Sequence, residues 1–374
     1  MARVVLAMSG GVDSSVAAHL LREAGHEVIG VFMRHGEAAP ASCASESSTE
    51  SSTARSSLPI VIASLHKQGC CTASDAEDAR RVAERLEIPF YAIDFQEEFG
   101  RIIDYFVEEY AAARTPNPCV MCNNWIKFGR LFDYADSVGA EFVATGHYAR
   151  LSACEHDGGP ALLRGVDTSK DQSYVLFGIE ERLLSRMLLP VGGYRKPEIR
   201  RMAEQLGLRV ADKRDSQEIC FVPDQDHAAF IRRREGGTQP GEIVTTAGAV
   251  VGTHDGLERF TIGQRKGLGV ALGEPRFVVR LERETGRVVL GSREELARRE
   301  LSASDANWLV PPGTEPRRAN IKIRYNAAPA PGTLTPQAIG SFRVEFDEPQ
   351  YGVAPGQAVV CYDGDRVLGG GWID

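Results

Sequence analysis

The sequence lacks the features of a membrane or secreted protein. No apolar run approaches the length needed to span a bilayer, and the first residues form no signal-peptide pattern. The composition, 43% hydrophobic and 25% charged residues, is typical of a globular protein in water. We therefore expect a cytoplasmic protein with no membrane partner. Its eight cysteines should serve as thiols, metal ligands or catalysts and not as structural disulfides.

Positive charge is also in short supply. The chain has 43 Lys and Arg residues against 51 Asp and Glu residues, and a net charge of −8 argues against indiscriminate nucleic-acid binding. A local basic face is still compatible with the sequence, because small basic clusters concentrate after residue 190. These clusters are Arg195 with Lys196, Arg200 with Arg201, Lys213 with Arg214, residues 232–234, Arg265 with Lys266, and Arg317 with Arg318.

A glycine-rich turn near the N-terminus lacks the lysine of a Walker loop. Residues 4–8 predict a buried strand and residues 13–21 a helix, with Ser-Gly-Gly at 9–11 between them. Adjacent glycines bring bare amides close to a ligand, and the positive end of the helix adds to an anion site. Asp13 follows where a Walker loop would carry its lysine, either as an Mg²⁺ partner or as a helix cap. The structural alternative is a capped strand-to-helix turn without a ligand.

Strands and helices alternate along the first half of the chain. Further strands are predicted at residues 27–33, 90–94 and 142–145. Ser74 and Glu77 have the spacing of a capping box that would open a helix between two of them. This alternation is typical of a parallel sheet covered by helices on both faces, which binds ligands at the carboxyl ends of its strands. Ser9, Met33 and Gly146 fall at such ends.

The chain is long enough for several domains. Residues 36–66 are low in complexity and rich in Ser, Ala and Thr, which predicts a largely disordered insertion in which Cys43 is a bystander. After about residue 220, turn signals separate β-rich runs. We expect a catalytic α/β domain over 1–212, a central β-rich domain over 213–292 and a C-terminal β-barrel over 293–374.

Two cysteines stand close together in the segment RTPNPCVMCNNWIKF, residues 114–128. Its prolines and asparagines predict that the helix begins only near Asn123. Cys122 would then lie just before a helix N-terminus, a position that lowers the pKa of a thiol. Cys119, three residues earlier, would lie in the irregular part of the segment.

The residues alone leave three uses of the cysteines open. Cys119 and Cys122 could bind zinc with His147, although the chain has no second C-x-x-C pair. Cys119, Cys122 and Cys220 could ligate an iron–sulfur cluster. Two separated thiols could instead carry sulfur, one as a persulfide that the other resolves as a disulfide. Burial as small hydrophobes is expected for Cys154 and Cys361.

Taken together, seven ordered motifs closely resemble those of bacterial tRNA-specific 2-thiouridylases, which belong to the pyrophosphate-loop ATP pyrophosphatases. The motifs are SGGVDSSV (9–16), GCC (69–71), TPNPCVMCN (115–123), ATGHYAR (144–150), SKDQSYVL (169–176), DSQEICF (215–221) and TIGQRKGLG (261–269). The resemblance covers nearly the whole chain apart from the insertion at 36–66. It implies an adenine-nucleotide α-hydrolase-like (Rossmann-like) first domain and a tRNA-binding central domain.

The resemblance implies ATP-dependent 2-thiolation of the wobble uridine of glutamate, lysine and glutamine tRNAs. ATP, with Mg²⁺, would adenylate the 2-oxygen, and a cysteine desulfurase or a sulfur-relay protein would supply persulfide sulfur. No metal ion is expected to reside in the protein itself. By motif match the residues that bind ATP are Ala7, Met8, Ser9, Gly10, Gly11, Val12, Asp13, Ser14, Met33 and Gly146.

The same match implies roles for the remaining site residues. Cys220 carries the persulfide and Cys122 is the nucleophile that completes transfer. The target base is bordered by Asn117, Pro118 and Cys119. Contacts with tRNA are implied for His147, Lys170, Asp171, Gln172, Arg324, Tyr325 and Gln357.

One position departs from the pattern of the family. Some members carry an aspartate, assigned as a general base, where Cys119 stands here. Either Cys119 acts as a thiolate, the base is dispensable, or the three cysteines hold a cluster. The alternative from a different class is a tRNA-binding protein without catalysis, which would bind anticodon stems and consume no ATP.

Overall fold

A computed structural model of the chain describes residues 1–34, 73–153, 159–215, 219–222, 226–235, 238–338 and 340–374. The predicted insertion at 36–66, with Cys43, lies outside the described residues. So do the GCC motif and Cys154. Within the described part, no helix is both long and apolar enough to cross a bilayer.

The first half of the chain forms a five-stranded parallel sheet in the order β3-β2-β1-β4-β7, as the alternating pattern predicts. The strands are β1 (Arg3–Ala7), β2 (Glu27–Arg34), β3 (Phe90–Asp94), β4 (Phe142–Ala144) and β7 (Met187–Leu188). β1 lies at the centre, between β2 and β4. The carboxyl ends of these three strands therefore meet at one edge of the sheet.

Helices cover both faces of this sheet because the strands are apolar on both faces. In β1, Val4 and Leu6 pack in one hydrophobic cluster, while Val5 and Ala7 pack in the other. The first cluster includes residues of α1 (Val12–Glu23), α2 (Ala73–Arg85) and α6 (Lys196–Gln205). The second includes residues of α3 (Gln96–Ala111), α4 (Pro118–Met121), η1 (Cys122–Arg130) and α5 (Leu131–Ser137).

The predicted capping box at the start of α2 is wrong. Ser74 lies inside the helix and not before it, so its side chain is not at a capping position. Glu77 instead accepts hydrogen bonds from Arg80 and Arg81, three and four residues further along the helix. Such pairs on an exposed helical surface stabilise the helix modestly. Glu77 therefore stabilises α2 through these pairs and not through a cap.

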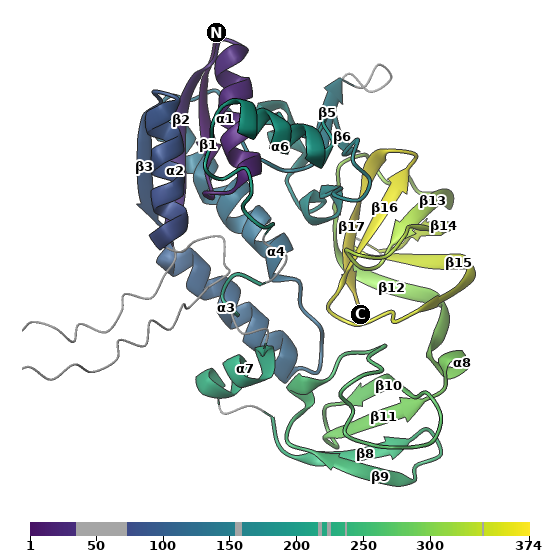
Figure 1. The fold of residues 1–374 in the computed structure, drawn as a ribbon. Coiled ribbons are helices and arrows are strands. Elements are labelled where there is room, and N and C mark those ends of the chain that lie inside the picture. The colour runs from purple at the N-terminus through teal and green to yellow at the C-terminus, as the bar shows by residue number, and fades with distance from the viewer. Residues whose placement is uncertain (35–72, 154–158, 216–218, 223–225, 236–237, 339) are drawn as a thin grey trace, which may run out of the picture.

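The central part of the chain forms a four-stranded sheet in the order β10-β11-β8-β9. Its elements are α7 (His227–Glu235), β8 (Gly241–Thr245), β9 (Val250–His254), η4 (Leu257–Arg259), β10 (Phe277–Glu282) and β11 (Arg287–Gly291). A single helical turn, α8 (Arg293–Leu296), leads from this sheet to the last part of the chain. In Figure 1 the sheet lies below the barrel and beyond the end of α3.

The last part of the chain is a closed six-stranded barrel, as expected. Its strands are β12 (Ala297–Trp308), β13 (Arg317–Lys322), β14 (Ala330–Pro336), β15 (Phe342–Tyr351), β16 (Ala358–Asp363) and β17 (Arg366–Ile373). Closure follows because β12 pairs with both β15 and β17. The hairpin β5 (Ala149–Ala153) and β6 (Pro160–Arg164) adds to the outside of β17, so the first part of the chain is joined to the barrel (Figure 1).

Candidate functional site

The glycine-rich turn has a backbone that only glycine can adopt. Gly10 has a φ of +71°, and a Cβ there would lie 2.2 Å from the carbonyl oxygen of Asp75. The Ser9 amide donates to Ser14 Oγ at 3.2 Å, and Ser15 Oγ donates to the Gly11 carbonyl at 2.8 Å. These local bonds fix the loop at the edge of the sheet, where the positive end of α1 favours an anion.

The other predicted nucleotide residues surround this turn. A Cβ on Gly146 would lie 2.7 Å from the Ser14 amide, so the chain after β4 passes directly against the start of α1. Met33, in β2, is buried beside the same edge. Ala7, Met8 and Val12 are also buried and form the floor beneath the loop.

A lysine far away in sequence supplies the positive charge that the loop lacks. Lys196 Nζ, on α6, donates to both carboxylate oxygens of Asp13 at 2.8 Å. It also pairs with Asp215 Oδ1 at 2.9 Å. Lys196 is only 7% exposed, and a buried ammonium needs such partners to offset its lost hydration. We name these three residues, Asp13, Lys196 and Asp215, the Lys196 bridge.

Further groups hold both ends of the Lys196 bridge. The Tyr148 hydroxyl donates to Asp13 Oδ1 at 2.7 Å, and burial together with the Asp13 charge raises the pKa of Tyr148. Lys170 Nζ donates to Asp215 Oδ2 at 2.7 Å. Burial alone would raise the pKa of Asp215, but the hydrogen bonds from Lys170 and Lys196 lower it to about 2. Asp215 therefore stays ionised throughout the physiological range.

A second distant lysine touches the loop from the other side. Lys213 Nζ donates to the Gly10 carbonyl at 2.9 Å and to carboxylate oxygens of Asp75 and Asp78, both at 2.7 Å. Lys196 and Lys213 belong to basic clusters in the sequence, but no sequence signal connects either residue with the loop. Spacing along the chain carries no signal that could have done so, because Lys196 is 183 residues from Asp13.

His147 is buried next to the loop and is neutral. Its Nδ1 lies 2.7 Å from Thr145 Oγ1, and its Nε2 lies 3.4 Å from Lys127 Nζ. Because the Lys127 ammonium can only donate, it donates to Nε2, and Nδ1–H donates to the threonine. Burial lowers the pKa of His147 well below its usual range, and the Lys127 charge lowers it further. The implied contact of His147 with tRNA stays a prediction.

We expect His147 to make the protein less stable in mild acid. The unfolded chain binds a proton near pH 6.5 that the folded chain does not, so the free energy of unfolding should fall as the pH drops below that value. The slope should reach about 1 kcal/mol per pH unit. Chemical denaturation between pH 7.5 and pH 5 measures it. A His147→Gln variant should show a slope smaller by that amount, and identical slopes would contradict the assignment.

The helix that carries the paired cysteines begins earlier than predicted. α4 starts at Pro118, with Asn117 as its cap: the Asn117 side chain accepts from the Val120 amide at 3.4 Å. Proline suits this first position because its φ is already helical and no amide is needed there. Cys122 therefore lies inside a helical run that continues into the π-helix η1. The position near a helix N-terminus belongs to the exposed Cys119 instead.

The C-terminal barrel holds the irregular backbone before α4. Gln357 Nε2 donates to the carbonyls of Thr115 at 2.9 Å and Pro116 at 3.2 Å. The Thr115 amide donates to the Pro355 carbonyl at 2.8 Å. Gln357, implied as a tRNA contact, is thus a support of the segment that carries Asn117, Pro118 and Cys119. A tRNA contact would have to use the remaining polar atoms of its side chain.

Cys122 and Cys220 lie against the same hydrophobic cluster beneath the sheet. Both are half-buried. The segment of Cys220 is anchored by Phe221, whose ring meets Phe99 and Phe106 edge to face with centroids 5.6 and 5.2 Å apart. By contrast, Cys361 is fully buried in the barrel, and burial raises the pKa of its thiol to about 12. Cys361 is thus a buried small hydrophobe, as the sequence predicts.

Three side chains of the SKDQSYVL motif bind other groups of the protein around the site. Asp171 is buried and accepts hydrogen bonds from the amides of Gly165 and Ser173, both at 3.1 Å. Gln172 accepts from the Tyr148 amide at 2.9 Å. With Lys170 in its ion pair with Asp215, all three side chains have partners inside the protein. Their contacts with tRNA stay predictions.

Arg324 and Tyr325 follow β13 of the barrel. Arg324 Nη2 donates to the Tyr351 carbonyl at 2.7 Å. Tyr325 is 37% exposed, and burial of its hydroxyl together with the charges of Asp171 and Cys119 raises the pKa of Tyr325 to about 12. The implied contacts of Arg324 and Tyr325 with tRNA stay predictions.

The geometry does not support a metal site. Among the residues that the structure describes, no three His, Cys, Asp or Glu side chains gather in an arrangement that could hold a metal ion. Neither zinc ligation with His147 nor a cluster on Cys119, Cys122 and Cys220 therefore finds support in this arrangement.

Three family models match consecutive parts of the chain. The tRNA methyl transferase HUP domain matches residues 2–224, the tRNA methyl transferase PRC-barrel domain 228–292, and the Aminomethyltransferase beta-barrel domain 298–373. The order and limits of these models follow the parallel sheet, the four-stranded sheet and the barrel described above.

Curated relatives match the chain over its full length. The tRNA-specific 2-thiouridylase MnmA of Rhodopirellula baltica is 59% identical over 100% of this chain and 96% of its own length. The protein of the same name from Geobacter metallireducens is 48% identical, again over 100% and 96%. A solved 4-thiouridine synthetase in complex with RNA and ATP is 15% identical with a TM-score of 0.33, over 60% of this chain and 46% of that chain. Similarity that low supports no conclusion about function.

Proposed function

This chain belongs to the tRNA-specific 2-thiouridylase family, and from that membership we propose how its site forms 2-thiouridine. The protein is an enzyme that introduces sulfur into uridine of tRNA. Its proposed substrates are the glutamate, lysine and glutamine tRNAs, thiolated at the wobble uridine in the cytoplasm. The observation that carries the mechanism is the Lys196 bridge. It ties Asp13, next to the phosphate loop, to Asp215, five residues before Cys220 in sequence.

The loop fits the phosphates of ATP. Any side chain at Gly10 or Gly146 would collide with neighbouring backbone, so both positions keep the edge of the sheet bare. The loop amides and the start of α1 would bind the phosphate oxygens. Mg²⁺ would offset phosphate charge, and Asp13 is the carboxylate beside the loop that could face it. Since both Asp13 oxygens already accept from Lys196, Mg²⁺ would take most of its ligands from phosphate and water.

The first step activates a poor leaving group. The 2-oxygen of the uridine attacks the α-phosphorus of ATP, a P–O bond forms to the base, and the bond to pyrophosphate breaks. Pyrophosphate leaves, the N3 proton of the uridine is released to solvent, and the base is O-adenylated. The Lys196 ammonium can stabilise the negative charge that develops on pyrophosphate. A pyrophosphate in the loop would compete with Asp13 for this ammonium. The uridine must leave the anticodon stack to reach this site, at a cost of about a few kcal/mol.

The second step transfers sulfur. A cysteine desulfurase or a sulfur-relay protein loads Cys220 as a persulfide. The Cys122 thiolate attacks the inner sulfur, a Cys122–Cys220 disulfide forms, and hydrosulfide is released. Hydrosulfide adds to C2 of the base, and AMP leaves with the original oxygen. Two equivalents of an external thiol then reduce the Cys122–Cys220 disulfide and are themselves joined as a disulfide, which supplies two electrons in each turnover.

Asp13→Ala should remove the first step. Without its carboxylate the loop loses the group that positions Lys196 and that could face a bound Mg²⁺, so tRNA-dependent pyrophosphate release should fall about a hundredfold or more. A coupled pyrophosphate assay with unmodified tRNA measures this rate. An unchanged rate would mean that the turn after β1 is not the ATP site.

The whole proposal is tested by one reaction. Purified protein, unmodified glutamate tRNA, ATP, Mg²⁺ and a persulfide donor should give 2-thiouridine at the wobble position, detected by mass spectrometry of the nucleosides. Colourless, metal-free protein that is active would end the cluster alternative, whereas activity that requires iron and sulfide would replace the persulfide mechanism. Binding of tRNA without consumption of ATP would support the non-catalytic alternative.

A further inference from the structure

The peptide group between Gly10 and Gly11 lies in the middle of the phosphate loop that follows β1. Gly10 has a φ of +71°, and Gly11 is the cap residue before α1. Within the described residues, neither the Gly10 amide nor the Gly11 amide donates a hydrogen bond. An amide without a protein partner beside a helix N-terminus is suited to an anionic ligand.

Lys213 fixes the direction of this peptide group. Its Nζ donates to the Gly10 carbonyl at 2.9 Å. Because a trans peptide is planar, the Gly11 N–H points in the direction opposite to the Gly10 carbonyl. A carbonyl held toward Lys213 therefore turns the Gly11 amide away from Lys213. Without this bond the peptide group could rotate, since two adjacent glycines impose few steric limits on it.

Two carboxylates of α2 hold the Lys213 ammonium in place. Asp75 Oδ1 and Asp78 Oδ2 each lie 2.7 Å from Nζ. Burial alone would lower the pKa of Lys213, but the hydrogen bonds with Asp75 and Asp78 raise it above its usual value. The ammonium therefore stays charged. It has three N–H donors, and the Gly10 carbonyl with the two carboxylates takes up all three.

The start of α2 also packs directly against the phosphate loop. A Cβ on Gly10 would lie 2.2 Å from the Asp75 carbonyl oxygen, and Asp75 is buried. The carboxylates that bind Lys213 therefore lie beside a loop that should accept a polyanion. Lys213 can act there in two ways: it orients a peptide group, and its charge offsets that of the carboxylates.

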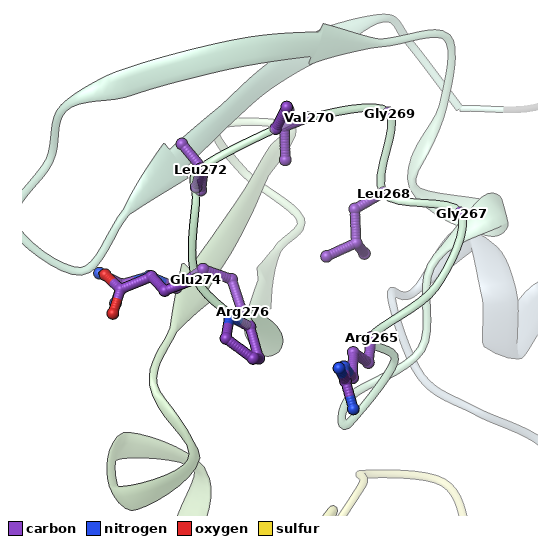
Figure 2. A pocket seen from close by; sticks show the side chains of 10 residues that line it. Arg265, Gly267, Leu268, Gly269, Val270, Leu272, Glu274 and Arg276 are labelled. Carbon is purple, nitrogen blue, oxygen red and sulfur yellow. The ribbon is translucent and has the colours of Figure 1, made fainter.

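Glycines with a positive φ do not bring such a contact by themselves. In the loop before β10 the glycines with a positive φ are Gly263, Gly267, Gly269 and Gly273. Figure 2 shows the side chains around this loop, where Arg276 pairs with Glu274. Among the described residues, no lysine or arginine side chain donates to a carbonyl of those four glycines. The contact of Lys213 with Gly10 is thus particular to the phosphate loop.

We propose that Lys213 is a positioning residue for ATP, which holds the Gly10 carbonyl so that the Gly11 amide donates to a phosphate oxygen. This inference rests on the proposed function, which places the phosphates of ATP in this loop. Lys213 itself does not bind the phosphate, because its three donors are already in use. It acts on the nucleotide through the peptide group, so its loss should weaken the binding of ATP.

The test is the equilibrium binding of ATP and Mg²⁺ to the full chain without tRNA, measured by isothermal titration calorimetry. Lys213→Met keeps the apolar stem and removes the ammonium, so ATP should bind roughly tenfold more weakly. In the pyrophosphate assay, KM for ATP should rise by a similar factor, with kcat at saturating ATP nearly unchanged. A general loss of structure would lower kcat and tRNA affinity as well.

The matched control is Arg214→Met. Arg214 follows Lys213 in the chain, is exposed, and has no hydrogen bond or ion pair within the described residues. This variant removes the same charge without touching the phosphate loop, and its ATP affinity should stay within about twofold of the wild type. An equal loss of affinity in Arg214→Met and Lys213→Met would overturn the proposal.

A double variant separates the held carbonyl from the charge. Asp78→Asn combined with Lys213→Met restores the net charge beside the loop but not the hydrogen bond to Gly10. If Lys213 acts through the peptide group, ATP affinity stays several-fold below that of the wild type. Full recovery in the double variant would show that charge alone matters and would overturn the positioning role.

Further measurements keep the test decisive. Chemical denaturation checks that each variant is folded, and Lys213→Gln, which also removes the charge, replaces Lys213→Met if that protein does not fold. Wild-type ATP affinity in the folded neutral variant would overturn the proposal. A wild-type protein that binds no ATP would instead contradict the proposed function, so the two failures give different results.

Discussion

Cys220→Ser should abolish the incorporation of sulfur into tRNA, by about a thousandfold or more, while pyrophosphate release continues. A serine hydroxyl has the size of a thiol but cannot carry a sulfur atom, so only the second step is lost. The two steps should separate because Cys220 packs against a hydrophobic cluster on one face of the sheet, whereas the phosphate loop is built from residues after β1.

Two measurements on the same sample check this result. Radiolabelled sulfur in tRNA reports transfer, and a coupled assay reports pyrophosphate. The control is Cys361→Ala, which removes a thiol buried in the barrel and should leave both rates near those of the wild type. Sulfur incorporation that survives in Cys220→Ser would remove the role of this residue. Simultaneous loss of pyrophosphate release would instead mean that the segment shapes the nucleotide site.

Lys196→Met should cost both stability and the first step. The substitution leaves Asp13 and Asp215 facing each other without the ammonium that joins them. Removing one partner of a buried ion pair costs about 3–5 kcal/mol, and the lower end applies here because the two carboxylates are 29% and 22% exposed. Pyrophosphate release should fall about a hundredfold, since the cation paired with Asp13 beside the loop is gone.

Two further variants separate the loss of stability from the effect of the Lys196 charge on the rate. Lys196→Arg keeps the cation and should recover most of the stability, but only part of the rate, because a planar guanidinium cannot repeat the ammonium geometry. Arg182→Met breaks the exposed pair with Glu180 and should cost less than about 1 kcal/mol. Chemical denaturation and the pyrophosphate assay measure these effects. A Lys196→Met protein with wild-type stability and rate would show that the Lys196 bridge has no function.

The start of the helix in the cysteine segment differs from its sequence-based prediction. Prolines and asparagines predicted irregular backbone up to residue 122, yet Asn117 caps a helix and Pro118 opens it. Both residues are compatible with loops and with helix starts, so composition alone could not separate the two readings. The consequence is chemical: Cys119, and not Cys122, lies in the first turn of the helix.

The sequence by itself determined the local features of this protein. The turn at residues 9–11, the parallel strands around it and the burial of Cys361 follow from signals within a few residues of each position. Only the tertiary structure decided which charges reach the turn and what holds the cysteine segment. Lys196 meets Asp13 across 183 residues, and Gln357 holds the Thr115 carbonyl across 242 residues. Such contacts depend on how the sheets and helices pack together, and spacing along the chain does not encode that packing.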